Sequence, residues 1–226
     1  MPVNALPSYA EQLVRGRRAV RSFRADPVPA ETLRAVFALA GAAPSNSNTQ
    51  PWHVEVASGD TRDRLSEALL QAHSRQAVST DFPYRDDLYT GRYAHRRQVA
   101  GSAMYQALGI ARDDDRARAA YDAESLKFYG APHVAMLFLP GNAEARMAAD
   151  LGIYAQTLLL ALTAYGIASC PQGLLSFYAD TVRDVLGVRD RKLLFGISFG
   201  YADTDAPINN IDIPRAELGE TTRFHH

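Results

Sequence analysis

The sequence has a single cysteine, Cys170, and no large excess of charge of either sign. One cysteine excludes a disulfide within the chain and a zinc site built on cysteines. The formal net charge of −1 argues against a protein that binds nucleic acid through bulk positive charge. At 226 residues, with 47% hydrophobic and 22% charged residues, the chain has a globular composition and can bury a core without such cross-links.

Several motifs that mark particular sites are missing. Neither Gly-x-Gly-x-x-Gly nor a P-loop pattern occurs, so a Rossmann nicotinamide site and a P-loop are both unsupported. The histidines His53, His73, His95 and His133 lack metal-ligand spacing, and we expect no metal site. The first residues show no basic region followed by an apolar one, so we expect no signal peptide and a cytoplasmic protein.

The run 151–179 contains no charged residue and is long enough to cross a membrane. Polar residues lie within it, and Gly166, Pro171 and Gly173 interrupt its second half. We therefore interpret its first part as a fully buried helix at the centre of a soluble protein, without contact to a membrane.

Apolar periodicity and turn residues predict a helix-rich single domain with few strands. The expected helices cover about 8–17, 30–41, 61–76, 95–108, 113–127, 144–165 and 180–187, and the expected strands cover 53–57, 132–138 and 193–199. The segment 166–173 is expected to be a loop, and the tail 203–224 to be irregular. This order favours an α+β or α/β sandwich with a modest sheet.

Two neighbouring segments carry the candidate chemistry. Arg15, Arg17, Arg18, Arg21 and Arg24 place five arginines in ten residues. The planar guanidinium suits phosphate, because it donates two hydrogen bonds at once. The run 43–52 then offers hydroxyls, amides and backbone N–H groups, which suit a polar ring. Together they indicate a phosphorylated cofactor; the alternatives are a solvated basic turn and a surface loop of turn-forming residues.

The segment 166–173 follows the long apolar run and is a third candidate. It can place a backbone N–H beside a ring nitrogen, or it can simply join two elements. No histidine lies in a recognisable partner motif for Cys170, so we expect that cysteine to be buried and structural. Trp52, which follows Pro51, is expected to lie in the core.

Four segments in this order resemble the nitroreductase family of FMN-dependent oxidoreductases. They are 17–23, 43–52, 166–173 and 196–201, and the tail segments 205–209 and 214–215 also resemble that family. The Ser-Cys-Pro-Gln run at 169–172, with 128–132, is most similar to the branch that includes nitrobenzoate reductases.

The resemblance implies a fold and an assembly. The expected fold is α+β, with three layers and a small mixed sheet between helices. The whole chain, 1–226, is expected to form one domain of a domain-swapped homodimer, with the tail 203–226 packed on the partner subunit. FMN would lie at the dimer interface, and both chains would contribute to each site.

The resemblance also assigns residues to the cofactor. Arg17, Arg18, Ala19 and Arg21 would hold the phosphate and the pyrimidine side, and Arg215 would complete the phosphate site. Pro44, Ser45, Asn46 and Asn48 would come from the other subunit, and Pro171, Gln172 and Gly173 would line the flavin face and its N5 edge. Two positions depart from the pattern: Ala19 stands where relatives commonly have Ser, and Ser125 stands where close relatives often have Asn near the pyrimidine ring.

The implied reaction is a ping-pong one. NAD(P)H passes hydride to flavin N5 and leaves, and a nitroaromatic or quinone-type acceptor then takes its place, without a side-chain acid or base. Residues 81–97 are the candidate substrate lid, in which Phe82, Tyr84, Tyr89 and Tyr93 would stack on a flat acceptor and Arg92 or Arg96 would attract a carboxylate. The alternative for this segment is a packing loop with a solvated basic edge.

Three other functions remain open at this stage. The same cofactor supports ene reduction, reductive dehalogenation or flavin breakdown. A flavin-binding module without catalysis is a second alternative. The third takes the arginine cluster as a docking patch for a protein or a phospholipid, and it predicts a colourless protein.

Overall fold

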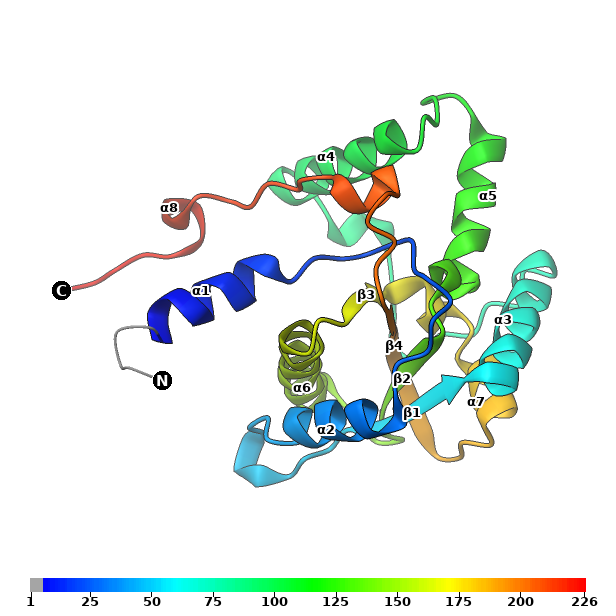
Figure 1. Ribbon diagram of the computed structural model, residues 1–226, viewed down its shortest axis with the longest axis horizontal. Coiled ribbons are helices and arrows are strands. Elements are labelled where there is room, and N and C mark those ends of the chain that lie inside the picture. The colour runs from blue at the N-terminus through cyan, green and yellow to red at the C-terminus, as the bar shows by residue number, and fades with distance from the viewer. Residues whose placement is uncertain (1–5) are drawn as a thin grey trace.

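A small antiparallel sheet forms the middle layer of the protein. The computed structural model describes residues 6–226, so the expectation about the first residues lies outside the described part. The sheet has the strand order β1-β2-β4-β3, with β1 at His53–Ser58, β2 at His133–Pro140, β3 at Ala168–Gln172 and β4 at Arg191–Gly200 (Figure 1). Each neighbouring pair of these strands is antiparallel.

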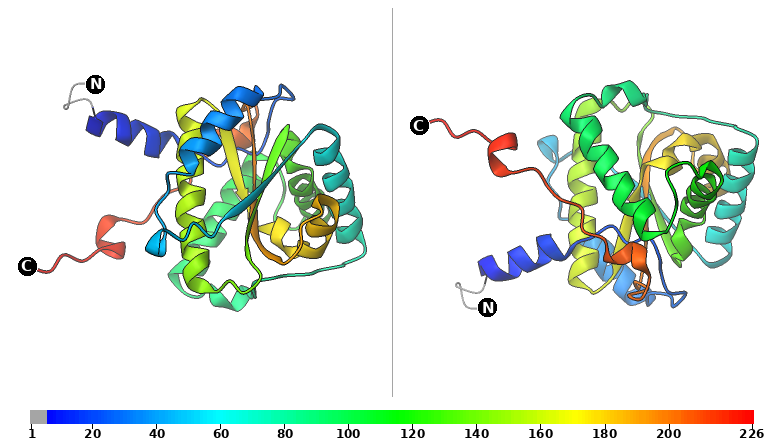
Figure 2. Two further views of the ribbon diagram at one scale, coloured as in Figure 1. Left: turned by 90° about the horizontal axis from the view of Figure 1, so that it is seen from below. Right: turned by 90° about the horizontal axis from the view of Figure 1, so that it is seen from above.

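Helices cover both faces of this sheet and complete a three-layer α+β fold (Figure 2). One face carries α2 (Ala30–Ala40) and α6 (Ala145–Ala164), and the other carries α3 (Gly59–Ser74), α5 (Asp115–Leu126) and α7 (Ala179–Leu186). Three further helices, α1 (Leu6–Gly16), α4 (Arg92–Ala107) and α8 (Leu218–Thr221), lie outside these layers. In every view α1 and the segment with α8 project on one side.

β2 is the central element of the core, because both of its faces are buried. Val134, Met136 and Phe138 pack into the cluster beneath α3 and α7. Ala135, Leu137 and Leu139 point to the opposite cluster, beneath α2 and α6. Strand side chains alternate between faces, so one apolar run supplies both cores.

α6 is buried on one face and exposed on the other. Leu151, Leu158 and Leu162 are fully buried against the sheet, whereas Ile153 is 43% exposed. The expectation of a fully buried helix is therefore wrong for the single chain. Among residues 6–226, α6 is the one helix whose length and composition would allow it to cross a membrane, and 44% of its most apolar window is buried inside the protein.

Two other expectations need correction. The sheet is antiparallel rather than mixed; the parallel pairing next to it is a single bridge between Ala19 and Ser169. The segment expected as a loop contains β3, which the presence of Pro171 concealed. Proline donates no ladder hydrogen bond and is tolerated at an edge, and β3 is an edge strand.

Local residues in the sequence predicted some helix boundaries correctly. Gly187 ends α7 with φ of +67°, a left-handed conformation that glycine adopts without steric cost. By contrast, α3 begins at Gly59, two residues before the expected start at 61, and its N-cap residue is Ser58.

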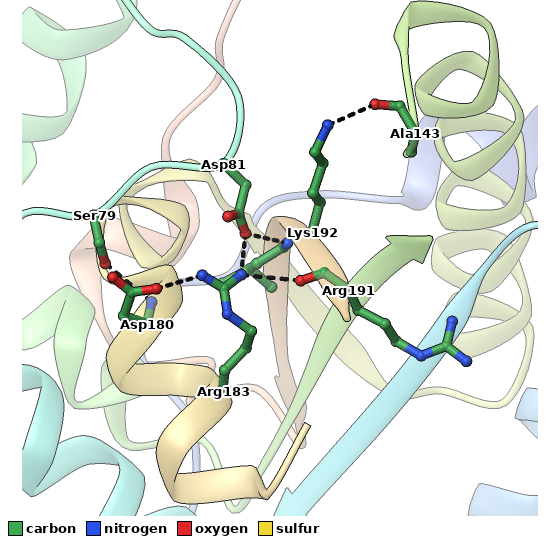
Figure 3. Close-up of polar contacts among 8 residues, drawn as sticks. Ser79, Asp81, Ala143, Asp180, Arg183, Arg191 and Lys192 are labelled. Carbon is green, nitrogen blue, oxygen red and sulfur yellow. Dashed lines mark hydrogen bonds and ion pairs between the residues drawn. The ribbon is translucent and has the colours of Figure 1, made fainter. Parts of the chain in front are cut away.

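An ion-pair cluster holds the segment between α3 and α4 against the body of the protein (Figure 3). Asp81 accepts hydrogen bonds from the Arg183 guanidinium and from Leu193 N, the latter at 2.6 Å. Arg183 also donates to Asp180 and to the Arg191 carbonyl. The Asp81 and Arg183 side chains are only 15% and 18% exposed, so this pair is screened little by solvent and anchors the start of the expected lid.

His133 is a buried histidine that joins β1, β2 and the chain before α2. Its Nε2 accepts a hydrogen bond from Val28 N at 2.9 Å, and its Nδ1 contacts the Ser58 hydroxyl. An acceptor at Nε2 requires the neutral ring, with the proton on Nδ1. Burial lowers the pKa of His133 below its usual value, in agreement with that tautomer.

We predict that His133 makes the folded state sensitive to acid. Because its folded pKa lies below the unfolded value of about 6.5, its contribution is complete above that pH and is lost as the pH falls through the folded pKa. His133→Gln should lower the free energy of unfolding near pH 7.5 by about 1–3 kcal/mol, through loss of a buried hydrogen-bond partner. It should also flatten the decline of stability between about pH 6.5 and 5.

Denaturant unfolding across this pH range measures both effects. His95→Gln, on the exposed face of α4, is the matched control and should leave the decline of stability at acid pH unchanged. If the His133 variant shows the same decline as the unmodified protein, His133 is not the source of the acid sensitivity.

Candidate functional site

A cavity of about 1030 Å³ lies between α1, α4, β3 and the tail. This volume is at the upper end of the range of about 300–1,000 Å³ that is usual for small-molecule sites. Five arginines and two carboxylates line it, together with apolar and amide side chains. The lining residues are Glu11, Val14, Arg15, Arg17, Arg18, Ala19, Arg21, Ala100, Met104, Gln156, Pro171, Ile211, Asp212, Ile213 and Arg215.

Residues 15–24, the arginine segment, are held in position by contacts with the edge of the sheet. Ala19 forms a parallel bridge with Ser169 of β3, and Val20 N donates to the Ser169 carbonyl at 3.0 Å. Arg24 N donates to the Tyr201 carbonyl at 2.9 Å, just beyond β4. The segment therefore continues the sheet for a few residues and presents its guanidinium groups to the cavity.

Asn209 fastens the tail to the arginine segment. Its Oδ1 accepts from Arg21 N at 2.7 Å, and its Nδ2 donates to the carbonyls of Ser22 and Asp203, each at 2.8 Å. Arg18 donates to the Ile211 carbonyl. Through these contacts the tail brings Arg215 to the same cavity as Arg17.

The arginine side chains in this cavity repel one another, although Glu11 pairs with Arg15 at 2.8 Å. Burial lowers the pKa of Arg17, and the nearby cation of Arg215 lowers it further. Such a set of cations gains stability when an anion enters, because the anion offsets the mutual repulsion and accepts the guanidinium hydrogen bonds. The cavity is therefore suited to a phosphate group.

Cys170 lies behind this cavity, and its thiol is unreactive. It is 1% exposed. Burial raises the pKa of its thiol to about 11, although the cations of Arg21 and Arg17 oppose the shift. The expectation of a structural cysteine is confirmed, since a protonated buried thiol is a poor nucleophile.

The structure brings some of the predicted cofactor residues together and leaves others apart. Arg17, Arg18, Ala19, Arg21, Pro171 and Arg215 all line the cavity. Gln172 and Ser125 are buried behind it, at 4% and 6% exposure, and bind each other. Gly173 follows β3 directly and begins the short helical turn Gly173–Phe177.

The polar loop with Pro44, Ser45, Asn46 and Asn48 does not line this cavity within one chain. Its backbone is strained: Ser47, Asn48 and Gln50 all have φ between +46° and +56°. Asn46 N donates to the buried Asp150 carboxylate at 3.0 Å, and Ser45 Oγ accepts from Gln50 N at 2.9 Å. Strained loops held by such contacts cluster at ligand sites.

Trp52 lies just after this loop. It stacks on Tyr154 of α6, with ring centroids 4.9 Å apart, and it is half-buried at the margin of the core rather than inside it.

The four aromatic residues of the expected lid lie outside the cavity lining. Phe82 packs against the core near Lys192, so it serves as an anchor in this structure. Tyr84 contacts the Phe177 ring, at 5.2 Å between centroids, and Tyr89, at 6.4 Å. Tyr93 is 51% exposed at the start of α4.

Several cavity residues escaped the sequence reasoning. Ala100 and Met104 come from α4, and Gln156 comes from the exposed face of α6. Ala100 and Met104 are small or apolar and carry no chemical signal, and Gln156 is a single amide within an apolar run, so only the three-dimensional arrangement identifies them. Among residues 6–226 no group of three or more metal-ligating side chains is found.

Comparison with known proteins decides the family. The profile of the Nitroreductase family matches residues 14–201. The chain is 66% identical over 223 residues to the nitroreductase NfnB of Mycolicibacterium smegmatis, with 99% of this chain and 95% of that protein covered. The chain belongs to the nitroreductase family. It is also 32% identical over 215 residues to a 4-nitrobenzoate reductase of Pseudomonas putida, covering 95% of this chain and 94% of that protein.

A solved structure supports the same assignment. The crystal structure of the FMN-dependent nitroreductase NfnB from Mycobacterium smegmatis in complex with NADPH matches with a TM-score of 0.96 at 66% identity. The match covers 98% of this chain and 100% of that chain. The resemblance to the family and the expected α+β nitroreductase fold are thus confirmed for this protein, which is an oxidoreductase of that family.

Proposed function

We propose that this nitroreductase binds FMN in the arginine-lined cavity and reduces nitroaromatic or quinone-type acceptors with electrons from NADPH. The single observation that carries the proposal is the convergence of Arg17, Arg18, Arg21 and Arg215 beside Pro171 in one cavity. The preference for NADPH and for nitroaromatics rests on what the relatives are named for.

The residues of the cavity fit FMN by their chemistry. A phosphate monoester carries up to two negative charges, and several guanidinium groups at one end of the cavity would bind it. Ala19 supplies no hydroxyl, but the bridge to Ser169 fixes its backbone beside the cavity. Bound FMN would supply the redox chemistry, taking hydride from NADPH and passing it to the acceptor in a ping-pong cycle.

The residues of the chain itself would bind and orient the cofactor and the acceptor, and they would exclude water. Pro171 would border the flavin face, and the tail with Ile211, Asp212 and Ile213 would close one side of the cavity. Tyr84, Tyr89 and Tyr93 would stack on a flat acceptor, and Arg92 or Arg96 would attract a carboxylate. In the single chain Arg96 pairs with Glu220 at 2.8 Å, so such a carboxylate would have to compete with Glu220.

A homodimer would complete the site. Gly152, Ile153 and Gln156 lie on the exposed face of α6, which carries no charge from Leu151 to its end. A helix face of this kind is typical of an interface. Pro44, Ser45, Asn46 and Asn48 would then reach the cavity of the other subunit. The tail 203–226 would pack on the partner, consistent with Leu218 and Phe224 being 62% and 68% exposed.

The arrangement favours one domain over residues 1–226, since the tail and the first helix both border one cavity. A cytoplasmic location is proposed as well, because NADPH, the donor of this reaction, is supplied there.

Steady-state kinetics test the proposed function. The FMN-loaded protein should oxidise NADPH when 4-nitrobenzoate is added, and double-reciprocal plots at several acceptor concentrations should give parallel lines. If FMN is bound and no nitroaromatic or quinone changes the rate of NADPH oxidation, the proposed acceptor class is wrong.

The phosphate assignment predicts a difference between FMN and riboflavin. Arg215→Gln should weaken FMN binding at least tenfold, since a hydrogen bond to a charged group contributes about 1.5–3 kcal/mol. Its affinity for riboflavin, which lacks the phosphate, should change less than threefold. Arg24→Gln, in the same arginine run but outside the cavity lining, is the control and should leave both affinities unchanged. Equal losses for both ligands would overturn the assignment; quenching of flavin fluorescence provides the measurement.

The dimer proposal predicts that Ile153→Glu gives a monomer that retains FMN poorly, because it buries a carboxylate in an apolar interface. Light scattering after size exclusion measures the mass. Val78→Glu is the matched control, since Val78 is 61% exposed on a segment away from α6. A dimer of unchanged stability in the Ile153 variant would show that this face is not the interface.

A further inference from the structure

The Gln172 side chain is enclosed by three hydrogen bonds inside the protein. Its Nε2 donates to the Ser125 carbonyl at 2.7 Å and to Ser125 Oγ at 3.3 Å, and its Oε1 accepts from the Ser198 hydroxyl. Ser198 is fully buried in β4, and Ser125 lies in the last turn of α5. One amide therefore joins the end of β3 to β4 and to α5.

Few side chains at position 172 could satisfy this pattern of hydrogen-bond donors and acceptors. The Ser125 carbonyl accepts only, so its neighbour must donate, whereas the opposite end of the same side chain must accept from Ser198. A neutral amide meets both requirements. A carboxylate would face the Ser125 carbonyl with two acceptors in contact. A protonated carboxylic acid has one O–H donor, so it would keep the bond to the Ser125 carbonyl and the bond from the Ser198 hydroxyl.

Strand alternation separates this side chain from the cavity. Pro171 is exposed on the cavity side of β3, and Gln172, one residue later, points to the interior. Pro171 consequently borders the cavity, while the buried Gln172 amide holds the end of β3 from behind. Among the cofactor residues expected from the sequence, Gln172 is thus placed to act without touching a ligand through its side chain.

We propose that Gln172 is a positioning residue whose buried link between Ser125 and Ser198 fixes the backbone edge facing the flavin and so sets the reduction potential of bound FMN. This inference rests on the proposed function. Its physical basis is that a fixed dipole or N–H group beside a ring whose charge changes on reduction stabilises one redox state over the other, and that effect depends steeply on position.

The hydroxyl and thiol groups next to this link stay protonated over an ordinary pH range. Burial raises the pKa of the Tyr129 hydroxyl beside Ser125 and raises that of Tyr121 next to it. The Cys170 thiol, two residues before Gln172, has its pKa raised to about 11 by burial. Arg21 is a permanent cation. On α5, Asp122 lies one turn before Ser125, and burial raises the pKa of its carboxyl. The Gln172→Leu variant keeps Asp122, so a pH dependence found only in Gln172→Glu belongs to the introduced carboxyl.

The test uses Gln172→Glu and Gln172→Leu in the FMN-loaded protein. The midpoint potential of bound FMN is measured by equilibrium with reference dyes from pH 5 to 9.5, and FMN affinity is measured in parallel on the apoprotein. Gln71→Glu makes the same substitution on the exposed face of α3 and serves as the matched control. Thermal unfolding of each variant checks that it is folded.

At alkaline pH the Gln172→Glu variant should differ from the unmodified protein by at least tenfold in the equilibrium constant for FMN reduction, about 30 mV for a two-electron couple. Towards pH 5 the difference should fall below threefold, because the protonated acid restores both hydrogen bonds. Gln172→Leu should show a difference that does not vary with pH, and Gln71→Glu should match the unmodified protein throughout. If Gln172→Glu releases FMN at alkaline pH, its affinity should recover at least tenfold on acidification.

Two results would overturn the inference. One is a folded Gln172→Glu variant with the same potential and affinity as the unmodified protein over the whole range. The other is a difference that persists undiminished at pH 5. Failure of the proposed function is distinct, since in that case the unmodified protein would itself fail to bind FMN or to be reduced by NADPH.

Discussion

Mutual repulsion among arginines is the constraint on which the site depends. The fold brings Arg17, Arg18, Arg21 and Arg215 into one partly buried cavity, and their mutual repulsion costs free energy that an entering anion would offset. The lowered pKa of Arg17, caused by burial and by Arg215, is a direct expression of that cost. A phosphorylated cofactor would therefore stabilise the protein as well as equip it for catalysis.

The rest of the molecule holds those charges in place. β2 is buried on both faces and unites two cores, and the antiparallel sheet it centres presents β3 at its edge. The arginine segment adds to that edge through the bridge of Ala19 with Ser169, and Asn209 ties the tail to it. Pro171 faces the cavity while Gln172 faces the interior, so a rigid framework of the kind that functional sites require extends up to the cavity wall.

Part of this could be predicted from the sequence. The patterns at 132–138 and 144–165 predicted a strand and a helix there, and the cluster of five arginines drew attention to a segment of which four, Arg15, Arg17, Arg18 and Arg21, line one cavity. β3 was missed because Pro171 and polar neighbours conceal a strand that tolerates them only at a sheet edge. The inward orientation of Gln172 and the roles of Met104 and Gln156 depend on register and on contacts distant in sequence, which local patterns do not encode. The polar loop at Ser45 and Asn46 lies apart from the cavity in one chain, so its role depends on a second subunit.

The absorption spectrum of the purified protein, before and after anaerobic addition of NADPH, tests the central claim most directly. The account predicts flavin bands that NADPH bleaches and that a nitroaromatic compound then restores. A flavin that NADPH leaves unbleached would contradict the proposed catalysis. A colourless protein that takes up no added FMN would contradict the assignment of the arginine cavity itself.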